Sequence, residues 1–241
     1  MTARMRLPSD TAVMLPGTGS DEVFVRAVFE QPLAGVGVRL VAPAPLPGGG
    51  LAESHLAALD ATAADADGPI LVGGVSFGAH LSSAWALRNQ SRCAGLLAAL
   101  PAWNGPPDAA PASLAARASA GLVRSYGVEH ALTVATADVA PWLAAELTRA
   151  WRRQGAGLAD GLDATSRHPA PELTALGTLD VPAGISACTD DPVHPAEVAY
   201  AWADAIPLAY VQDTTLAALG ADPASLGRAT VLALLRAIAG R

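Results

Sequence analysis

Short apolar runs alternate with longer helical patterns along most of the chain, and this alternation limits the folds that the chain can adopt. The runs are mostly bounded by proline, glycine or polar residues, as buried parallel strands are. They cover residues 11–15, 38–42, 70–75, 94–100, 183–187 and 208–211. The helical patterns cover residues 21–34, 52–65, 77–89, 196–205 and 223–239. Because each is long enough to cross between parallel strands, the sequence predicts an α/β fold, with a mainly parallel sheet and helices on both faces.

The alternation stops between residues 104 and 182, where several prolines open a stretch of amphipathic helical patterns without a convincing strand. These patterns cover residues 112–126, 128–138 and 141–154. We therefore expect a helical cap, inserted at 104–182, and a core formed by 1–103 and 183–241. The last pattern has an apolar stripe of Trp142, Leu143, Leu147 and Trp151. This stripe packs onto the core or lines a substrate pocket beneath the cap, and the two interpretations overlap.

Composition excludes several classes of protein. Apolar residues make up 51% of the 241 residues and charged residues only 15%, which favours a compact fold over disorder. The 15 basic residues are all arginines, and 22 acids bring the net charge to −7. This balance argues against a nucleic acid or an anionic membrane as partner and leaves a small molecule as the expected one.

The location of the protein and the state of its thiols also follow from local patterns. No apolar stretch follows the first arginines, so we expect no secretory signal peptide and a cytoplasmic protein. Residues 68–87 lack charged residues but contain His80, serines and glycines, so we do not expect a membrane helix there. Cys93 and Cys188 flank apolar runs and are expected to be reduced core thiols.

A G-x-S-x-G motif, Gly74-Val75-Ser76-Phe77-Gly78, lies directly after the third predicted strand and directly before a predicted helix. The small residues two before and two after the serine let neighbouring backbone approach without a Cβ clash. A serine on such a strand-to-helix turn is held at the carboxyl edge of the sheet. The motif therefore predicts a nucleophile elbow at Ser76.

With this elbow, the chain from Thr11 to its C-terminal helix resembles the α/β-hydrolase family, and in particular its esterase- and lipase-like serine hydrolases. The resemblance implies that Ser76 is the nucleophile. It also implies an oxyanion hole formed by the N–H groups of Thr18, in the Leu-Pro-Gly-Thr-Gly loop after the first strand, and Phe77. Asp191 begins a D-x-x-x-P pattern after the fifth predicted strand, where the family places its acid. The insertion lies where members of the family carry a cap.

The general base is the uncertain part of this resemblance. The chain has five histidines, which are His55, His80, His130, His168 and His194. The family places its catalytic histidine after the last strand, but residues 212–217 contain none. His194 is the best candidate because it shares a loop with Asp191, although a D-P-x-H-P turn can simply cap the following helix. The carboxylate of Asp213 is a further, weaker candidate.

We expect the other histidines to be structural. His80 lies one turn after Ser76 and reads as a satisfied core histidine, and His168 reads as loop surface. His55 and His130 lie on predicted helices and are expected to be solvated.

The glycines after the first strand do not indicate a nucleotide site. The third glycine of a dinucleotide fingerprint is replaced by Glu22, and no lysine is present for a phosphate-binding loop. We expect no cofactor and no metal. The sequence predicts a serine hydrolase acting on a small apolar ester or thioester. The alternative is a catalytically degenerate α/β-hydrolase fold that binds a ligand, which the missing late histidine favours.

Overall fold

The computed structural model describes residues 7–240, and its centre is a six-stranded sheet in the order β2-β1-β3-β4-β5-β6. Every neighbouring pair of strands is parallel. The strands are β1 (Thr11–Leu15), β2 (Arg39–Val41), β3 (Ile70–Val75), β4 (Cys93–Ala99), β5 (Ala183–Cys188) and β6 (Ala209–Thr214). The α/β class predicted from the sequence is confirmed. Residues 1–6, which bear on the expected absence of a signal peptide, lie outside the described residues.

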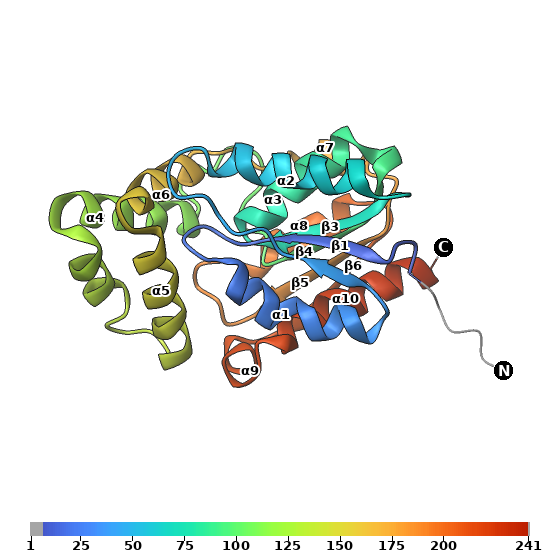
Figure 1. Cartoon of the computed structure of the whole chain (residues 1–241). Coiled ribbons are helices and arrows are strands. Elements are labelled where there is room, and N and C mark those ends of the chain that lie inside the picture. The colour runs from blue at the N-terminus through green and yellow to red at the C-terminus, as the bar shows by residue number, and fades with distance from the viewer. Residues whose placement is uncertain (1–6, 241) are drawn as a thin grey trace.

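Helices connect the strands and cover both faces of the sheet (Figure 1). Those of the α/β alternation are α1 (Glu22–Gly35), α2 (Leu51–Asp65), α3 (Phe77–Arg88), α8 (Ala196–Ala205), α9 (Leu216–Ala221) and α10 (Ala224–Ala239), with a short 3-10 helix, η1 (Gln90–Arg92). All five helices expected in the alternation are present, with ends shifted by at most one residue. The six residues of α9 were not predicted.

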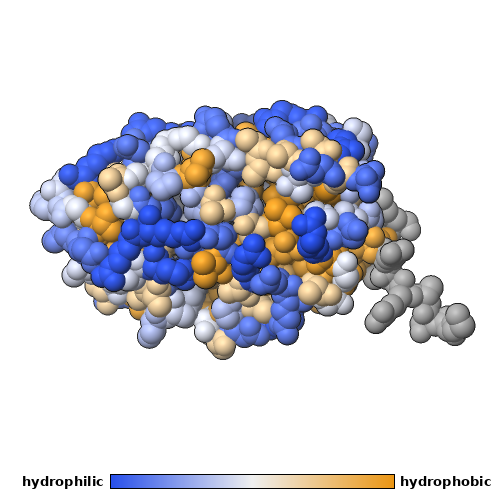
Figure 2. Space-filling model, viewed as in Figure 1, coloured by the Kyte–Doolittle hydropathy of each residue, from blue (hydrophilic) through white to orange (hydrophobic). Residues whose placement is uncertain are grey.

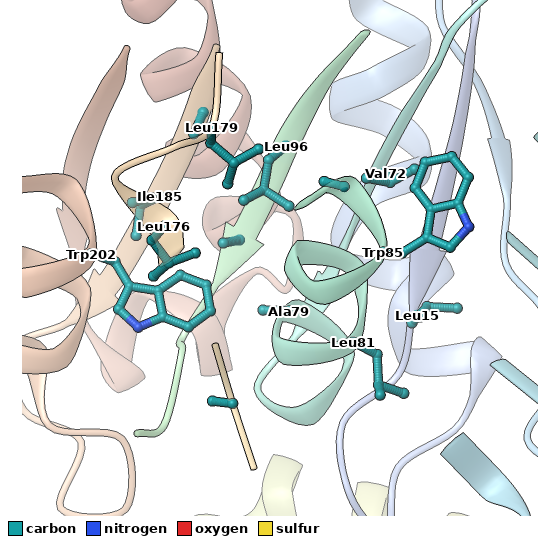
Figure 3. Close-up of a cluster of buried hydrophobic side chains, with 14 of the residues drawn as sticks. Leu15, Val72, Ala79, Leu81, Trp85, Leu96, Leu176, Leu179, Ile185 and Trp202 are labelled. Atoms are coloured by element: carbon teal, nitrogen blue, oxygen red, sulfur yellow. The ribbon is translucent and has the colours of Figure 1, made fainter. Parts of the chain in front are cut away.

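Two apolar clusters hold the layers together. One lies between the sheet and α1 with α10, and the other between the sheet and α2, α3 and α8. Figure 3 shows Trp85 and Trp202 of the second cluster on opposite sides of α3, with Ile185 of β5 on the Trp202 side and Leu96 of β4 nearer the middle. The four central strands are buried along their length, whereas the edge strands β2 and β6 are partly exposed. In open parallel sheets of this kind, ligands bind at the loops outside the carboxyl ends of the strands.

The segment between β4 and β5 is helical, as the sequence predicts. It contains α4 (Pro111–Ala135), α5 (Pro141–Gln154), η2 (Gly155–Gly157), α6 (Leu158–Ser166) and α7 (Leu173–Leu176). Gly127 has a φ of 82° and breaks α4 into the two helices that the pattern suggested. Helices α4, α5 and α6 share an apolar cluster of their own and lie beyond one end of the sheet, whereas α7 packs into the main core (Figure 1).

Two further structural expectations concern the state of the thiols and the absence of a membrane helix. Cys93 and Cys188 are buried and free, as expected, and burial raises the pKa of both thiols to about 12. Among residues 7–240, none of the helices has the length and hydropathy of a membrane span. The face drawn in Figure 2 mixes hydrophilic and hydrophobic residues, and the part over α4 and α5 is mostly hydrophilic.

The expectation that His55 is solvated is wrong. His55 lies on the same face of α2 as Leu51 and Leu59, is 1% exposed, and packs inward with them. Its Nε2 atom is buried and has no hydrogen-bond partner among the described residues. Burial therefore lowers the pKa of His55 to about 4. His130 is exposed on α4, as expected.

The buried imidazole of His55 makes stability depend on pH. Its pKa is about 4 in the folded chain and about 6.5 in an unfolded one, so its stabilising contribution is complete above pH 6.5 and is lost as the pH falls toward 4. We expect His55→Leu to reduce the loss of unfolding free energy between pH 7 and pH 5 by about 2 kcal/mol. Urea unfolding at the two pH values measures this.

The matched control is His130→Leu, which removes an exposed imidazole and should leave the pH dependence of the wild type unchanged. Parallel pH dependences for the wild type and His55→Leu would contradict the assignment.

Candidate active site

Ser76 lies at the turn from β3 into α3 and has a strained backbone. Its φ is 54° and its ψ is −115°, a conformation that L-residues other than glycine rarely adopt. The turn is anchored by its own N–H, which donates to the Ala99 carbonyl of β4 at 2.8 Å. The residue is only 8% exposed. This geometry lifts the Ser76 hydroxyl above the carboxyl edge of the sheet.

The glycines of the motif are required by contacts, as the sequence suggests. A Cβ on Gly74 would lie 2.5 Å from the Leu15 carbonyl oxygen, and a Cβ on Gly78 would lie 2.3 Å from the same atom. Both distances are well below van der Waals contact with a backbone atom that cannot easily move. The two glycines therefore let β1 approach the turn closely.

His194 joins Ser76 to Asp191. The His194 Nδ1 atom lies 2.8 Å from the Asp191 Oδ2 atom, and its Nε2 atom lies 3.0 Å from the Ser76 Oγ atom. Since a carboxylate only accepts hydrogen bonds, the Nδ1–H donates to Asp191, and the Nε2 lone pair is left to accept from the Ser76 hydroxyl. The structure thus brings together the serine, the acid and the first candidate for the base.

The Asp191 carboxylate also shapes the loop that carries His194. Its Oδ1 atom accepts hydrogen bonds from the N–H groups of Val193, at 2.7 Å, and His194, at 3.1 Å. Burial raises the pKa of Asp191, but the bonds from the His194 ring and from these two N–H groups outweigh burial and hold the pKa below its ordinary value. Asp191 therefore stays ionised beside the imidazole at neutral pH.

The candidate oxyanion donors lie on either side of Ser76 in the fold. Phe77 is the first residue of α3, so its N–H has no acceptor within that helix. Thr18 follows β1 in a turn whose hydrogen bond runs from Ser20 N–H to the Gly17 carbonyl, at 3.1 Å. A Cβ on Gly17 would lie 3.4 Å from the Ser76 Cβ atom, so this turn lies directly against the elbow.

The two other carboxylates that the sequence offered point elsewhere. Asp190 is exposed and accepts a hydrogen bond from the Leu216 N–H at 2.7 Å, at the start of α9. Asp213 is exposed and accepts one from the Tyr200 hydroxyl at 3.1 Å. Thr215, in the segment where the resembling family places its histidine, caps α9.

Two further histidines lie near the site without bonding to Ser76. His80 is buried as expected, and its Nε2 atom accepts from the Ala102 N–H at 3.0 Å. The expectation that it is fully satisfied is wrong, because its buried Nδ1 atom has no partner among the described residues. Burial lowers the pKa of His80 to about 3, with smaller contributions from His194 and His168. His168 lies on a loop as expected, but its half-buried ring packs edge-on against Phe77 at 5.4 Å.

Both tryptophans of the apolar stripe of α5 pack against other hydrophobic side chains. Trp142 stacks on Phe24 of α1 with ring centroids 6.5 Å apart, and Trp151 is buried in the cluster shared by α4, α5 and α6. In the part of the chain that the structure describes, no group of three or more His, Cys, Asp or Glu residues is placed to hold a metal ion.

Comparisons with known proteins support the fold. No protein-family model matches the sequence, and no curated protein matches it. Among solved structures, MenH from S. aureus is similar with a TM-score of 0.69 and 16% identity, covering 97% of this chain and 96% of that one. A thermophilic esterase from Thermogutta terrifontis is similar with a TM-score of 0.64 and 19% identity, covering 86% of this chain and 81% of that one. An alpha/beta hydrolase from Sphaerobacter thermophilus is similar with a TM-score of 0.59 and 18% identity, covering 86% of this chain and 84% of that one.

The chain has the α/β-hydrolase fold. At these identities the likeness concerns the fold, and the chemistry of this member rests on its own residues. Within the fold, the base candidate follows β5 rather than the last strand. Sequence reasoning identified His194 only as the best of several candidates. The signal for its placement is the three-residue spacing from Asp191, which allows one carboxylate to cap the turn and to bind the ring.

The elbow glycine Gly78 offers a test of this geometry. Because an alanine Cβ would meet the Leu15 carbonyl oxygen at 2.3 Å, Gly78→Ala should lower the free energy of unfolding by about 3 kcal/mol. Urea denaturation measures the change. The control is Gly121→Ala in α4, where a Cβ meets nothing within 4 Å and should stabilise the helix by about 0.5 to 1 kcal/mol. Equal effects of the two substitutions would show that the elbow is not closely packed.

Proposed function

We propose that the protein is a serine hydrolase that cleaves small apolar carboxylic esters or thioesters. Ser76 is the nucleophile, His194 the general base, and Asp191 the acid that orients it. The observation that carries this proposal is the continuous hydrogen-bonded path from Asp191 through His194 to Ser76, with heavy-atom distances of 2.8 and 3.0 Å. These distances are the ones that a working base requires for proton removal.

Acylation follows from the arrangement. As the Ser76 oxygen attacks the ester carbonyl, its proton moves to the His194 Nε2 atom, and the ionised Asp191 stabilises the imidazolium through the Nδ1–H. The carbonyl oxygen becomes an oxyanion that accepts hydrogen bonds from the N–H groups of Thr18 and Phe77. The tetrahedral intermediate then collapses, the bond to the leaving group breaks, and the imidazolium returns its proton to the departing alcohol or thiol.

Deacylation repeats the steps with water. His194 takes a proton from the water that attacks the acyl-Ser76 carbonyl, and the Ser76 oxygen leaves and takes that proton back. The products are a carboxylic acid and the free enzyme. No oxidant, reductant or metal ion is required to balance these steps.

The enclosure of Ser76 supports a small, apolar acyl group. Ser76 is 8% exposed, and the aromatic ring of Phe77, the next residue in the chain, packs against the imidazole of His168. We propose that α4, α5 and α6 act as the cap. They share an apolar cluster separate from those of the sheet, and α5 contacts the loop that carries Thr18. The similarity to an esterase is consistent with this substrate class.

The first test is labelling and turnover. A fluorophosphonate should label the wild-type protein at Ser76, and Ser76→Ala should not react, as intact-mass analysis measures. His194→Ala should lower kcat for p-nitrophenyl butyrate by about 10³-fold or more, because the serine proton then has no positioned acceptor. The control His130→Ala removes an exposed imidazole and should leave kcat unchanged. Melting temperatures confirm that each variant is folded.

A folded wild-type protein that neither reacts with the probe nor hydrolyses any ester would contradict the proposal. The fold would then serve as a ligand-binding module.

The second test separates the two neighbouring aspartates. Asp191→Asn removes the charge that stabilises the His194 imidazolium and disfavours the correct tautomer, so kcat should fall by about 10⁴-fold. Asp190→Asn is the matched control, because Asp190 bonds to the Leu216 N–H on the far side of the loop, and its kcat should stay within about twofold. Ester hydrolysis by both variants above pH 7 measures the difference. The reverse order of effects would overturn the assignment of the acid.

A further inference from the structure

Helix α5 holds four consecutive residues, 19 to 22, that follow the candidate oxyanion donor Thr18 and lead into α1. Each of the four contacts a different part of α5. The contacts are Gly19 with Trp151, Ser20 with Glu146 and Gln154, Asp21 with Arg149, and Glu22 with Arg153. A segment held in this way, residue by residue, cannot shift unless α5 shifts with it.

The centre of this contact is an ionic cluster of two buried carboxylates and one partly exposed guanidinium. Arg149 binds Asp21 through two nitrogens, with Nη2 2.7 Å from Oδ1 and Nε 3.1 Å from Oδ2, and it also binds Glu146. Glu146 accepts a hydrogen bond from the Ser20 hydroxyl at 2.7 Å. The side chains of Asp21 and Glu146 are 0% and 8% exposed, whereas that of Arg149 is 39% exposed. One guanidinium thus separates two buried carboxylates.

Arg149 is the cation that contacts both carboxylates, and the Arg153 Nη1 atom lies 3.9 Å from the Asp21 Oδ2 atom. Burial raises the pKa of Asp21, but the bond from Arg149 and the N–H groups of Phe24 and Val23 lower it below the ordinary value. Burial raises the pKa of Glu146, and its bonds to Ser20 and Arg149 offset this only in part. Without Arg149, Asp21 would keep the longer contact with Arg153, but the two acids would repel each other and the loop would be held less tightly on α5.

The other side of the same loop rests on the elbow. A Cβ on Gly17 would lie 3.2 Å from the Val75 carbonyl oxygen and 3.4 Å from the Ser76 Cβ atom. A Cβ on Gly19, which has a φ of 70°, would lie 2.9 Å from the Trp151 Nε1 atom. Thr18 is therefore held between a neighbour packed on the nucleophile turn and a neighbour packed on α5. The position of Thr18 thus depends on both contacts.

We propose that Arg149 and Glu146 are positioning residues for the reaction: by fixing residues 19–22 on α5, they aim the Thr18 N–H at the oxyanion formed on Ser76. The inference rests on the proposed hydrolase function. It makes the seating of the helical segment between β4 and β5 a requirement for transition-state stabilisation, in addition to any role in covering the substrate. The two residues touch neither substrate nor nucleophile, and they act through the loop.

The test compares three substitutions on one helix. Arg149→Met removes the charge and all three hydrogen bonds to Asp21 and Glu146, and we expect kcat for p-nitrophenyl butyrate to fall about 10²-fold with KM within about twofold, as for loss of one oxyanion donor. Arg149→Lys keeps the charge but not the two-pronged geometry, and should recover part of the loss. Arg152→Met is the matched control, because Arg152 pairs with Glu129 of α4 and not with the loop. Its kcat should match that of the wild type.

A transition-state readout distinguishes positioning from general destabilisation. A trifluoromethyl ketone forms a tetrahedral adduct with the serine, so its inhibition constant should rise in Arg149→Met in proportion to the fall in kcat. If Arg149→Met does not fold, Glu146→Gln carries the test, with an expected fall in kcat of about tenfold and a parallel rise in the inhibition constant.

The outcomes separate the two proposals. An active wild type whose folded Arg149→Met variant, or Glu146→Gln in its place, keeps its kcat and its affinity for the ketone overturns the positioning role and leaves the hydrolase intact. A wild type that is inert toward esters and toward the fluorophosphonate overturns both.

Discussion

The φ of 54° at Ser76 sets the geometry on which the rest of the site depends. This conformation is strained for a serine and persists only where the surrounding structure holds it. Here the hydrogen bond to β4 and the close approach of β1 to Gly74 and Gly78 hold it. These contacts require β1, β3 and β4 to lie side by side in the sheet, with glycine where the end of β1 meets the turn. The buried sheet, covered by helices on both faces, is thus the support that keeps one hydroxyl raised at its carboxyl edge.

A single loop supplies both residues that we propose as partners of the Ser76 hydroxyl. Asp191 and His194 belong to one loop after β5, and the same carboxylate that closes the loop also orients the imidazole. A loop that loses its turn therefore loses the base as well. The segment after β6 therefore does not have to supply the base. In that segment Thr215 caps α9, and the Leu216 N–H donates to Asp190. The chemistry we propose needs only that the three groups meet, whatever strand each follows.

Much of the fold could be predicted from the sequence because buried parallel strands and crossover helices leave strong periodic signals. The short helices α7 and α9 span about one turn and leave no such signal. His55 was misjudged because α2 is rich in alanine, so the pattern does not define which face is buried. The elbow was predictable from its glycines. The pairing of His194 with Ser76 was not, since it depends on how a loop turn caps itself and on the placement of β5 two strands away.

A crystal structure of the protein after reaction with a p-nitrophenyl phosphonate tests the central claim most directly. The account predicts phosphorus bonded to the Ser76 Oγ atom, the phosphonyl oxygen accepting hydrogen bonds from the Thr18 and Phe77 N–H groups, and the His194 ring still bonded to Asp191 with its Nε2 atom facing the adduct. A modified Ser76 with the His194 ring turned to solvent, and another group placed to take the serine proton, would contradict it.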